Sequence, residues 1–120
     1  MSEEQAMAEM KKLGGYWASA GCLDLSFSHI TDAGLEHLKG LTDLQWLDLR
    51  NAEITDAGLE HLKGLKLQEL LLTNTHVTDA GLKHLKGLTK LQRLFLNGTQ
   101  VTDAGVKDLK QALPELYILR

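Results

Sequence analysis

The chain has 120 residues, which suits a single domain, and 43% of them are hydrophobic, with leucine dominant. The formal net charge of −3 gives no basic field of the kind that nucleic-acid-binding domains carry, so nucleic acid is not an expected partner. No run of about 18 apolar residues is present, and the N-terminus lacks the basic and apolar regions of a signal peptide. These absences and the single cysteine, Cys22, lead us to expect a cytoplasmic protein without a membrane contact.

The first residues are predicted to form a helix. Ser2-Glu3-Glu4-Gln5 has the pattern of a capping box, and Gly14-Gly15 is placed to end the helix. Its apolar residues fall on one face: Met7, Met10 and Leu13. We interpret residues 1–19 as an N-terminal helical cap, with Tyr16 and Trp17 as added apolar surface, and residues 20–120 as the repeat region.

The phrase Thr-Asp-Ala-Gly recurs four times, beginning at positions 31, 55, 78 and 102. The intervals of 24, 23 and 24 residues are typical of a repeat built from one strand and one helix. The shorter interval reflects the loss of one residue at Leu65-Lys66-Leu67, which we place in a loop before an intact strand. The sequence is therefore one unit copied along the chain.

Within each copy, residues 44–54, 67–77 and 91–101 follow the leucine spacing of the pattern L-x-x-L-x-L-x-x-N/C-x-L, and a degenerate first copy begins near residue 20. Over about residues 20–120 the chain resembles leucine-rich-repeat proteins, in particular the bacterial-type or cysteine-containing-like repeats of 24 residues with a helical convex side. The resemblance implies an α/β fold: a right-handed solenoid with a parallel β-sheet on its concave face and helices on its convex face. It implies an interaction scaffold and says almost nothing about the partner.

The residues themselves favour the same architecture. Leu47 and Leu49 alternate with exposed positions, as a strand requires, and residues 55–65 carry leucines at helical spacing. The threonine or aspartate of the phrase can cap the helix. The glycine of the phrase costs helix propensity, so we expect it to permit close packing against the neighbouring coil. No copy can bury its leucines alone, and the two ends need covers.

The last copy is incomplete. We align Leu116 with Leu91, which places Pro114 in a loop and puts Ile118 and Arg120 in exposed columns of a truncated fifth strand without a C-terminal cap. An unpaired sheet edge favours pairing with another chain. A homodimer through Leu116, Ile118 and Arg120 is therefore one hypothesis. The alternatives are a domain cut from a longer solenoid, or an edge short enough to tolerate water.

Binding residues are expected on the concave face, where three positions of each copy point outward and vary between copies. Large apolar side chains rimmed by charge are typical of binding surfaces, in which aromatic residues and arginine are favoured. The hypothesis is a protein-binding patch made by six residues: Trp46, Asp48, Arg50, Leu71, Arg93 and Phe95. The alternative is that these are scattered surface residues without a role.

The sequence does not indicate a catalytic site or a metal site. Histidines 37, 61 and 84 share a helical position, but packed helices would hold them too far apart for one metal ion, and the lysines at 39, 63, 86 and 110 interleave with acids. No nucleophile lies near a base, and no phosphate loop or paired-cysteine motif is present, so we expect no enzyme activity and no cofactor. The sequence predicts a non-enzymatic protein–protein interaction scaffold. The alternative is a structural, self-assembling repeat protein or an idealised, designed sequence without a native ligand.

Overall fold

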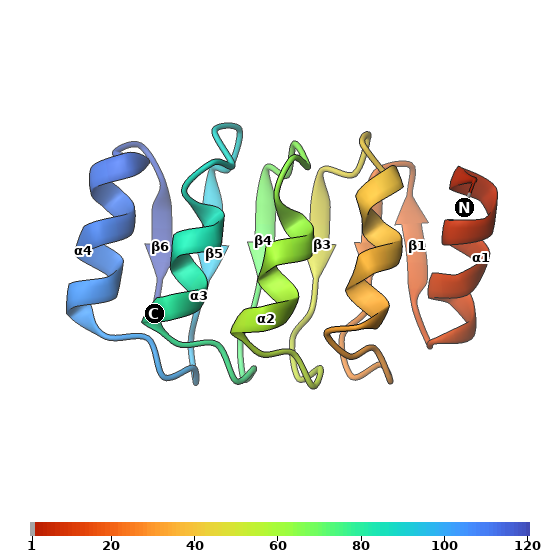
Figure 1. Ribbon diagram of the computed structural model, residues 1–120, viewed down its shortest axis with the longest axis horizontal. Coiled ribbons are helices and arrows are strands. Elements are labelled where there is room, and N and C mark those ends of the chain that lie inside the picture. Colours follow the sequence, from red (N-terminus) through yellow and green to blue (C-terminus); the bar gives the residue numbers. More distant parts are fainter. Residues whose placement is uncertain (1) are drawn as a thin grey trace.

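The computed structural model describes residues 2–120, which form helices on one side of a six-stranded sheet (Figure 1). In chain order the elements are α1 (Glu3–Lys12), β1 (Tyr16–Ser19), β2 (Cys22–Asp24), the 3-10 helix η1 (Gly34–Gly40), β3 (Trp46–Asp48), α2 (Asp56–Leu59), η2 (Glu60–Leu62), β4 (Glu69–Leu71), α3 (Asp79–Leu82), η3 (Lys83–Leu85), β5 (Arg93–Phe95), α4 (Asp103–Ala112) and β6 (Tyr117–Leu119). None of the described helices is long and apolar enough to cross a membrane.

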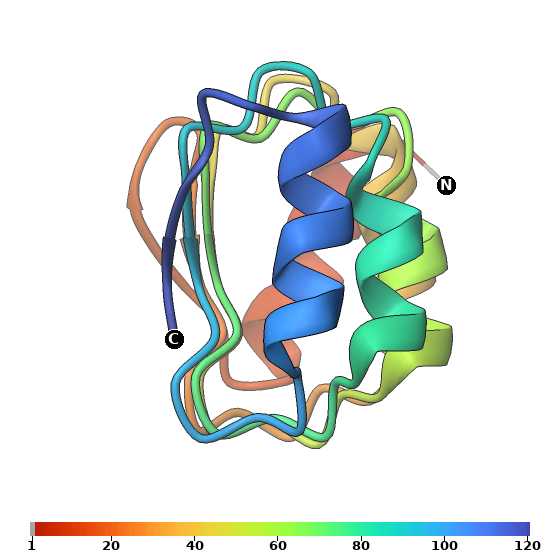
Figure 2. The ribbon, with the colours of Figure 1, turned by 90° about the vertical axis from the view of Figure 1, so that its left-hand side faces the viewer.

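The strands lie in chain order, and β2 to β6 are parallel. Leu23 pairs with Leu47, Leu47 with Leu70, and Leu70 with Leu94, so the expected ladder through these leucines is confirmed. The one-residue loss near Leu67 leaves the β3 to β4 register intact, as predicted, because it falls in the preceding loop. The chain is a solenoid with the sheet along one side and the helices along the other (Figures 1 and 2). These sides correspond to the concave and convex faces of the predicted architecture.

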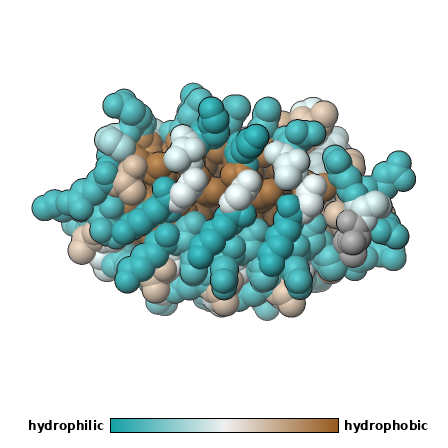
Figure 3. Space-filling model, turned by 45° about the horizontal axis from the view of Figure 1, so that its top comes forward, coloured by the Kyte–Doolittle hydropathy of each residue, from teal (hydrophilic) through white to brown (hydrophobic). Residues whose placement is uncertain are grey.

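One continuous core fills the space between sheet and helices. The leucines at the two inward strand positions are fully buried in the complete coils, and the helical Leu35, Leu59 and Leu82 meet them with at most 2% exposure. Figure 3 looks toward the loops that lead from helices into strands, where an apolar band runs along the molecule between polar side chains. Leucines 41, 65, 88 and 113 of these loops are at most 8% exposed and belong to the core.

The N-terminal helix is capped as predicted. Gln5 N–H donates to Ser2 Oγ at 3.2 Å, and Ser2 N–H donates to Gln5 Oε1 at 2.8 Å. The strand β1 was not predicted: Tyr16 and Trp17 pair antiparallel with Asp24 and Leu23 of β2. The aromatic residues therefore extend the sheet instead of only adding apolar surface.

The helical segments of the inner coils are short, with one α-helical turn followed by 3-10 turns, where the sequence predicted a helix over residues 55–65. Thr78 Oγ1 and Thr102 Oγ1 accept from backbone N–H groups of the helices they precede, whereas Thr55 makes no such side-chain cap. The expected close packing at the glycines is confirmed, because a Cβ at Gly58 would collide with Asp32 and Leu35 of the preceding coil.

The register of the last strand corrects the sequence alignment. Tyr117 pairs with Arg93, Ile118 with Leu94 and Leu119 with Phe95, so Ile118 points toward the core and not out of the concave face. The prediction assigned each residue after Leu116 to a pattern position that is one too early, because the last coil has one residue fewer between its buried leucine and its strand than the coil before it. Tyr117 and Leu119 take the exposed places.

Candidate functional site

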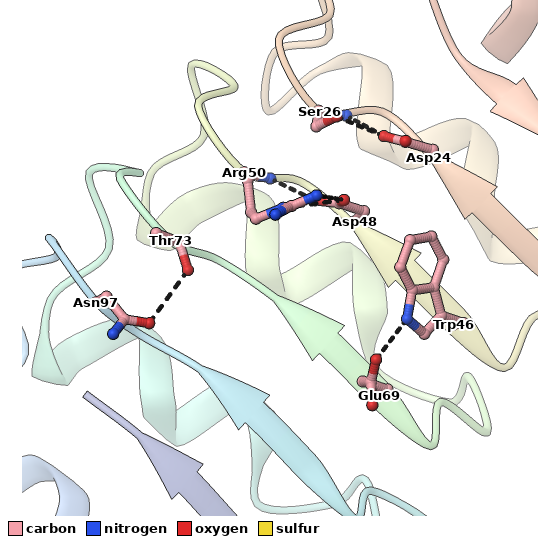
Figure 4. Close-up of polar contacts among 8 residues, drawn as sticks. All are labelled: Asp24, Ser26, Trp46, Asp48, Arg50, Glu69, Thr73 and Asn97. Carbon is pink, nitrogen blue, oxygen red and sulfur yellow. Dashed lines mark hydrogen bonds and ion pairs between the residues drawn. The ribbon is translucent and has the colours of Figure 1, made fainter.

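The parallel strands arrange equivalent side chains of the concave face in columns that cross the sheet. The central residue of each three-residue strand points into the core, so the residues on either side of it point outward. One column contains Cys22, Trp46, Glu69, Arg93 and Tyr117, and the other contains Asp24, Asp48, Leu71, Phe95 and Leu119. Figure 4 shows polar contacts on this face, of which Trp46–Glu69 and Thr73–Asn97 join neighbouring coils.

Glu69 connects two of the predicted binding residues. Trp46 Nε1–H donates to Glu69 Oε2 at 2.5 Å, and Arg93 Nη1–H donates to Glu69 Oε1 at 3.3 Å (the tryptophan contact is drawn in Figure 4). The indole is half-buried, while the Arg93 side chain is 64% exposed. One carboxylate therefore orients both side chains from β4, midway between β3 and β5.

Asp48 is fully buried, although it was predicted as an exposed binding residue. Its carboxylate accepts from the backbone N–H of Arg50 at 3.0 Å, from Nε at 2.9 Å and from Nη2 at 2.7 Å, so the guanidinium folds over it (Figure 4). The hydrogen bond to Asp48 raises the pKa of Arg50. Asp48 thus fixes the position of Arg50, whose own side chain remains 44% exposed.

Apolar side chains follow the second column toward the C-terminal edge. Leu71 is 9% exposed, Phe95 is half-buried and Leu119 is 38% exposed, while Tyr117 beside them is 58% exposed. The sequence identified the first two and missed Tyr117 and Leu119, because the register of the last strand was misplaced by one residue. The other end of this column is polar, because Asp24 accepts hydrogen bonds from Ser26 N–H and Oγ–H.

The repeat pattern is matched directly by the comparison with protein families. The family described as leucine rich repeat matches residues 22–77, and a second leucine rich repeat family matches residues 87–110. The chain belongs to the leucine-rich-repeat family. None of the curated proteins that were compared matches its sequence.

Solved structures support the same family. Internalin C2 of Listeria monocytogenes is 28% identical with a TM-score of 0.67, over 81% of this chain and 39% of that chain. A leucine-rich-repeat protein of Leptospira interrogans is 25% identical with a TM-score of 0.51, over 69% and 21%. The leucine-rich-repeat chain thus spans less than half the length of either protein. The Chaetomium Mex67:Mtr2 subunits, 19% identical with a TM-score of 0.71 over 98% and 89%, share the fold.

Leucine-rich repeats generally serve as non-enzymatic interaction scaffolds with an extended concave surface. The predicted patch residues of this leucine-rich-repeat chain fall on that surface in two groups. Trp46 and Arg93 meet at Glu69, a residue that the sequence had not singled out. Leu71 and Phe95 lie side by side on β4 and β5.

The residues predicted to form the self-association edge are less exposed than expected. Leu116 is only 2% exposed, and Ile118 is half-buried against the core. Arg120 Nη1–H donates to the carbonyl oxygen of Val101 at 3.1 Å, and Nη2 pairs with Asp103. The exposed apolar residues of this edge are Tyr117 and Leu119, and self-association through it stays a prediction.

Proposed function

We propose that the chain binds a protein partner through its concave face as a non-catalytic interaction module. The observation that supports this most is the network of Trp46, Glu69 and Arg93. Tryptophan and arginine are the residue types that most often dominate binding energy. Because a shared carboxylate already orients both, fewer side-chain rotamers are lost when a partner binds.

The surroundings of this network match the usual anatomy of an interface. Leu71, Phe95, Leu119 and Tyr117 offer apolar surface toward the C-terminal edge, and Arg50, held by Asp48, offers a positioned cation. A partner that complements this face would present an apolar side chain to Phe95 and a carboxylate to Arg50 or Arg93.

The test begins with capture of partners and then measures affinity by calorimetry with the purified partner. Trp46→Ala combined with Phe95→Ala is expected to weaken binding by about 30-fold or more, as loss of two anchor residues does. Glu60→Ala combined with Lys63→Ala is the matched control, because both side chains are exposed on the convex face. Equal affinity of the concave variant and the control would remove the concave face as the binding site.

A structural, self-assembling role is the second candidate, and the exposed Tyr117 and Leu119 on the unpaired edge strand favour it. In this role β6, with Leu116, Ile118 and Arg120, would pair with another chain. Leu119→Lys would then abolish a concentration-dependent increase in mass, measured by sedimentation equilibrium. A mass that rises equally in this variant would contradict edge pairing.

A further inference from the structure

The charge of the chain is divided along the solenoid. Residues 1–60 contain eleven acidic and four basic residues, whereas residues 61–120 contain five acidic and nine basic residues. Because the coils stack in chain order, the acidic half is the N-terminal end and the basic half is the C-terminal end. The 38 Å long molecule therefore has ends of opposite sign.

Helices form both ends of the molecule: α1 lies beyond β1 at one end, and α4 lies beyond β6 at the other (Figure 1). The helices α1 and α4 each run opposite to the strand that follows them (Figure 1). The strand β1 runs opposite to the other strands. As a result, α1 and α4 run in opposite directions. The view from the C-terminal end shows α4 in front with nothing stacked upon it (Figure 2).

The outward side of α4 carries a charged and apolar stripe. Gly105 and Leu109 face the core, and Asp108 pairs with Lys86 of the preceding coil at 2.8 Å. The side of the helix turned away from this preceding coil presents Asp103, Val106 and Lys110 at spacings of three and four residues, and Val106 also packs against the core at the border of this side. Val106 is half-buried, Lys110 is exposed without an ion-pair partner among the described residues, and the Asp103 side chain is 93% exposed despite its contact with Arg120.

The outward side of α1 carries the complementary stripe. Ala6 and Met10 are buried against the first coil, so the opposite side presents Glu4, Ala8 and Lys11 at spacings of four and three residues. All three are exposed, and neither charged residue has an ion-pair partner among residues 2–120.

We propose that copies of this chain associate head to tail, with α4 of one copy packed antiparallel on α1 of the next. Antiparallel packing places Lys110 beside Glu4, Val106 beside Ala8 and Asp103 beside Lys11, because the residue spacings of the two stripes match in reverse order. A small residue opposite a branched one permits close approach of the helices. The interface is heterologous, so it generates open chains of copies and not closed dimers. It leaves the concave face free and does not depend on the binding function proposed for it.

The area of the end faces limits the affinity of this association. The cross-section of 23 by 22 Å corresponds to about 500 Å² on each partner, below the roughly 800 Å² of a standard stable interface. Association is therefore expected in the high micromolar range and at low salt. Raising the salt to about 1 M, where the screening length is roughly 3 Å, is expected to dissociate it.

The test is a charge exchange followed by sedimentation equilibrium at about 0.05 M salt and protein up to about 1 mM. The wild type is expected to increase in average mass with concentration. Glu4→Lys alone and Lys110→Glu alone each bring like charges together, and each is expected to weaken association about tenfold or more. An equimolar mixture of the two variants restores opposite charges at every contact, so its mass is expected to return to that of the wild type.

Glu60→Lys and Lys83→Glu are matched controls, because they make the same changes of charge at exposed helical positions of inner coils. Each control alone, and the mixture of the two, is expected to associate as the wild type does. Circular dichroism checks that all variants fold, and Lys11→Glu with Asp103→Lys provides a second pair. A wild type that stays monomeric at 1 mM, or variants that associate alone as strongly as the controls, would overturn the proposal.

Discussion

The carboxylate of Asp56 occupies the space that a side chain at Gly81 of the next coil would need. The same carboxylate accepts from Thr78 N–H at 2.7 Å and from Thr78 Oγ1–H at 2.5 Å. Equivalent contacts join Asp32 to Thr55 and Asp79 to Thr102, beside Gly58 and Gly105. The Thr-Asp-Ala-Gly phrase is thus explained by contacts between coils, and its recurrence requires no ligand.

Gly81→Ala is expected to destabilise the fold by about 1–3 kcal/mol, because the added Cβ collides with Asp56. Helix propensity alone predicts the opposite sign, a gain of about 1 kcal/mol. Urea unfolding measures the difference. Gly87→Ala is the control, since a Cβ there meets nothing within 4 Å. Equal stability of the two variants would refute the steric explanation.

Acid is expected to weaken the contact between Asp79 and Thr102. Hydrogen bonds from the side chain and backbone of Thr102 lower the pKa of Asp79. A lowered folded-state pKa contributes stability that is complete above the unfolded value of about 3.9 and is lost as the pH falls through the folded value.

As the pH falls below about 4, the melting temperature of the wild type is therefore expected to fall more steeply than that of Asp79→Asn, which cannot titrate. Asp43→Asn is the control, because the Asp43 side chain is exposed. Parallel pH profiles for the wild type and Asp79→Asn would show that this carboxyl does not couple pH to folding.

The repeat period and leucine spacing predict the sheet ladder because stacking constrains them directly: Leu23, Leu47, Leu70 and Leu94 each lie under the next coil. The register of the last strand is not predicted correctly, because this constraint from stacking is missing on one of its sides. No further coil in the described chain specifies its register, and one residue decides whether Ile118 or Tyr117 is exposed.

The sequence predicts which residues lie on the concave face, but it does not predict which of them contact one another. Alternation correctly places Trp46 and Arg93 on one face, whereas the burial of Asp48 depends on the rotamer of Arg50 two residues away. Glu69 is one charged residue among many in the sequence, and only the pairing of β3 with β4 brings it to the Trp46 indole. The sequence signal for the strand β1 is weak. It consists of the pair Tyr16-Trp17 in a short segment between glycines, and a loop is an equally good interpretation of such a segment.

Phe27→Asn is expected to stabilise the protein by about 1 kcal/mol. Phe27 has φ 55°, a left-handed conformation that is costly for a bulky residue, and it is 75% exposed, so its replacement loses little burial. Asn51 and Asn74 adopt the same conformation in the following coils, and their side chains hydrogen-bond at 3.2 Å. Chemical denaturation measures the gain, with Asn51→Phe as the reciprocal change that is expected to destabilise. A loss of stability in Phe27→Asn would mean that the aromatic ring makes a contribution larger than the backbone strain.

Arg50→Met is expected to destabilise the fold by about 2 kcal/mol, because it leaves the buried carboxylate of Asp48 without its guanidinium. Arg93→Met is the control: its side chain is 64% exposed and makes one contact of 3.3 Å, so its loss is expected to cost under about 0.5 kcal/mol.

The next coil shows how the same positions are filled without charge, with Leu71 in place of Asp48 and Thr73 in place of Arg50. The double substitution Asp48→Leu with Arg50→Thr is therefore expected to regain most of the stability that Arg50→Met loses, since it removes the buried charge together with its partner. Guanidinium unfolding of the three variants completes the test. If the double variant is no more stable than Arg50→Met, the uncompensated charge of Asp48 is not what destabilises Arg50→Met, and this explanation is refuted.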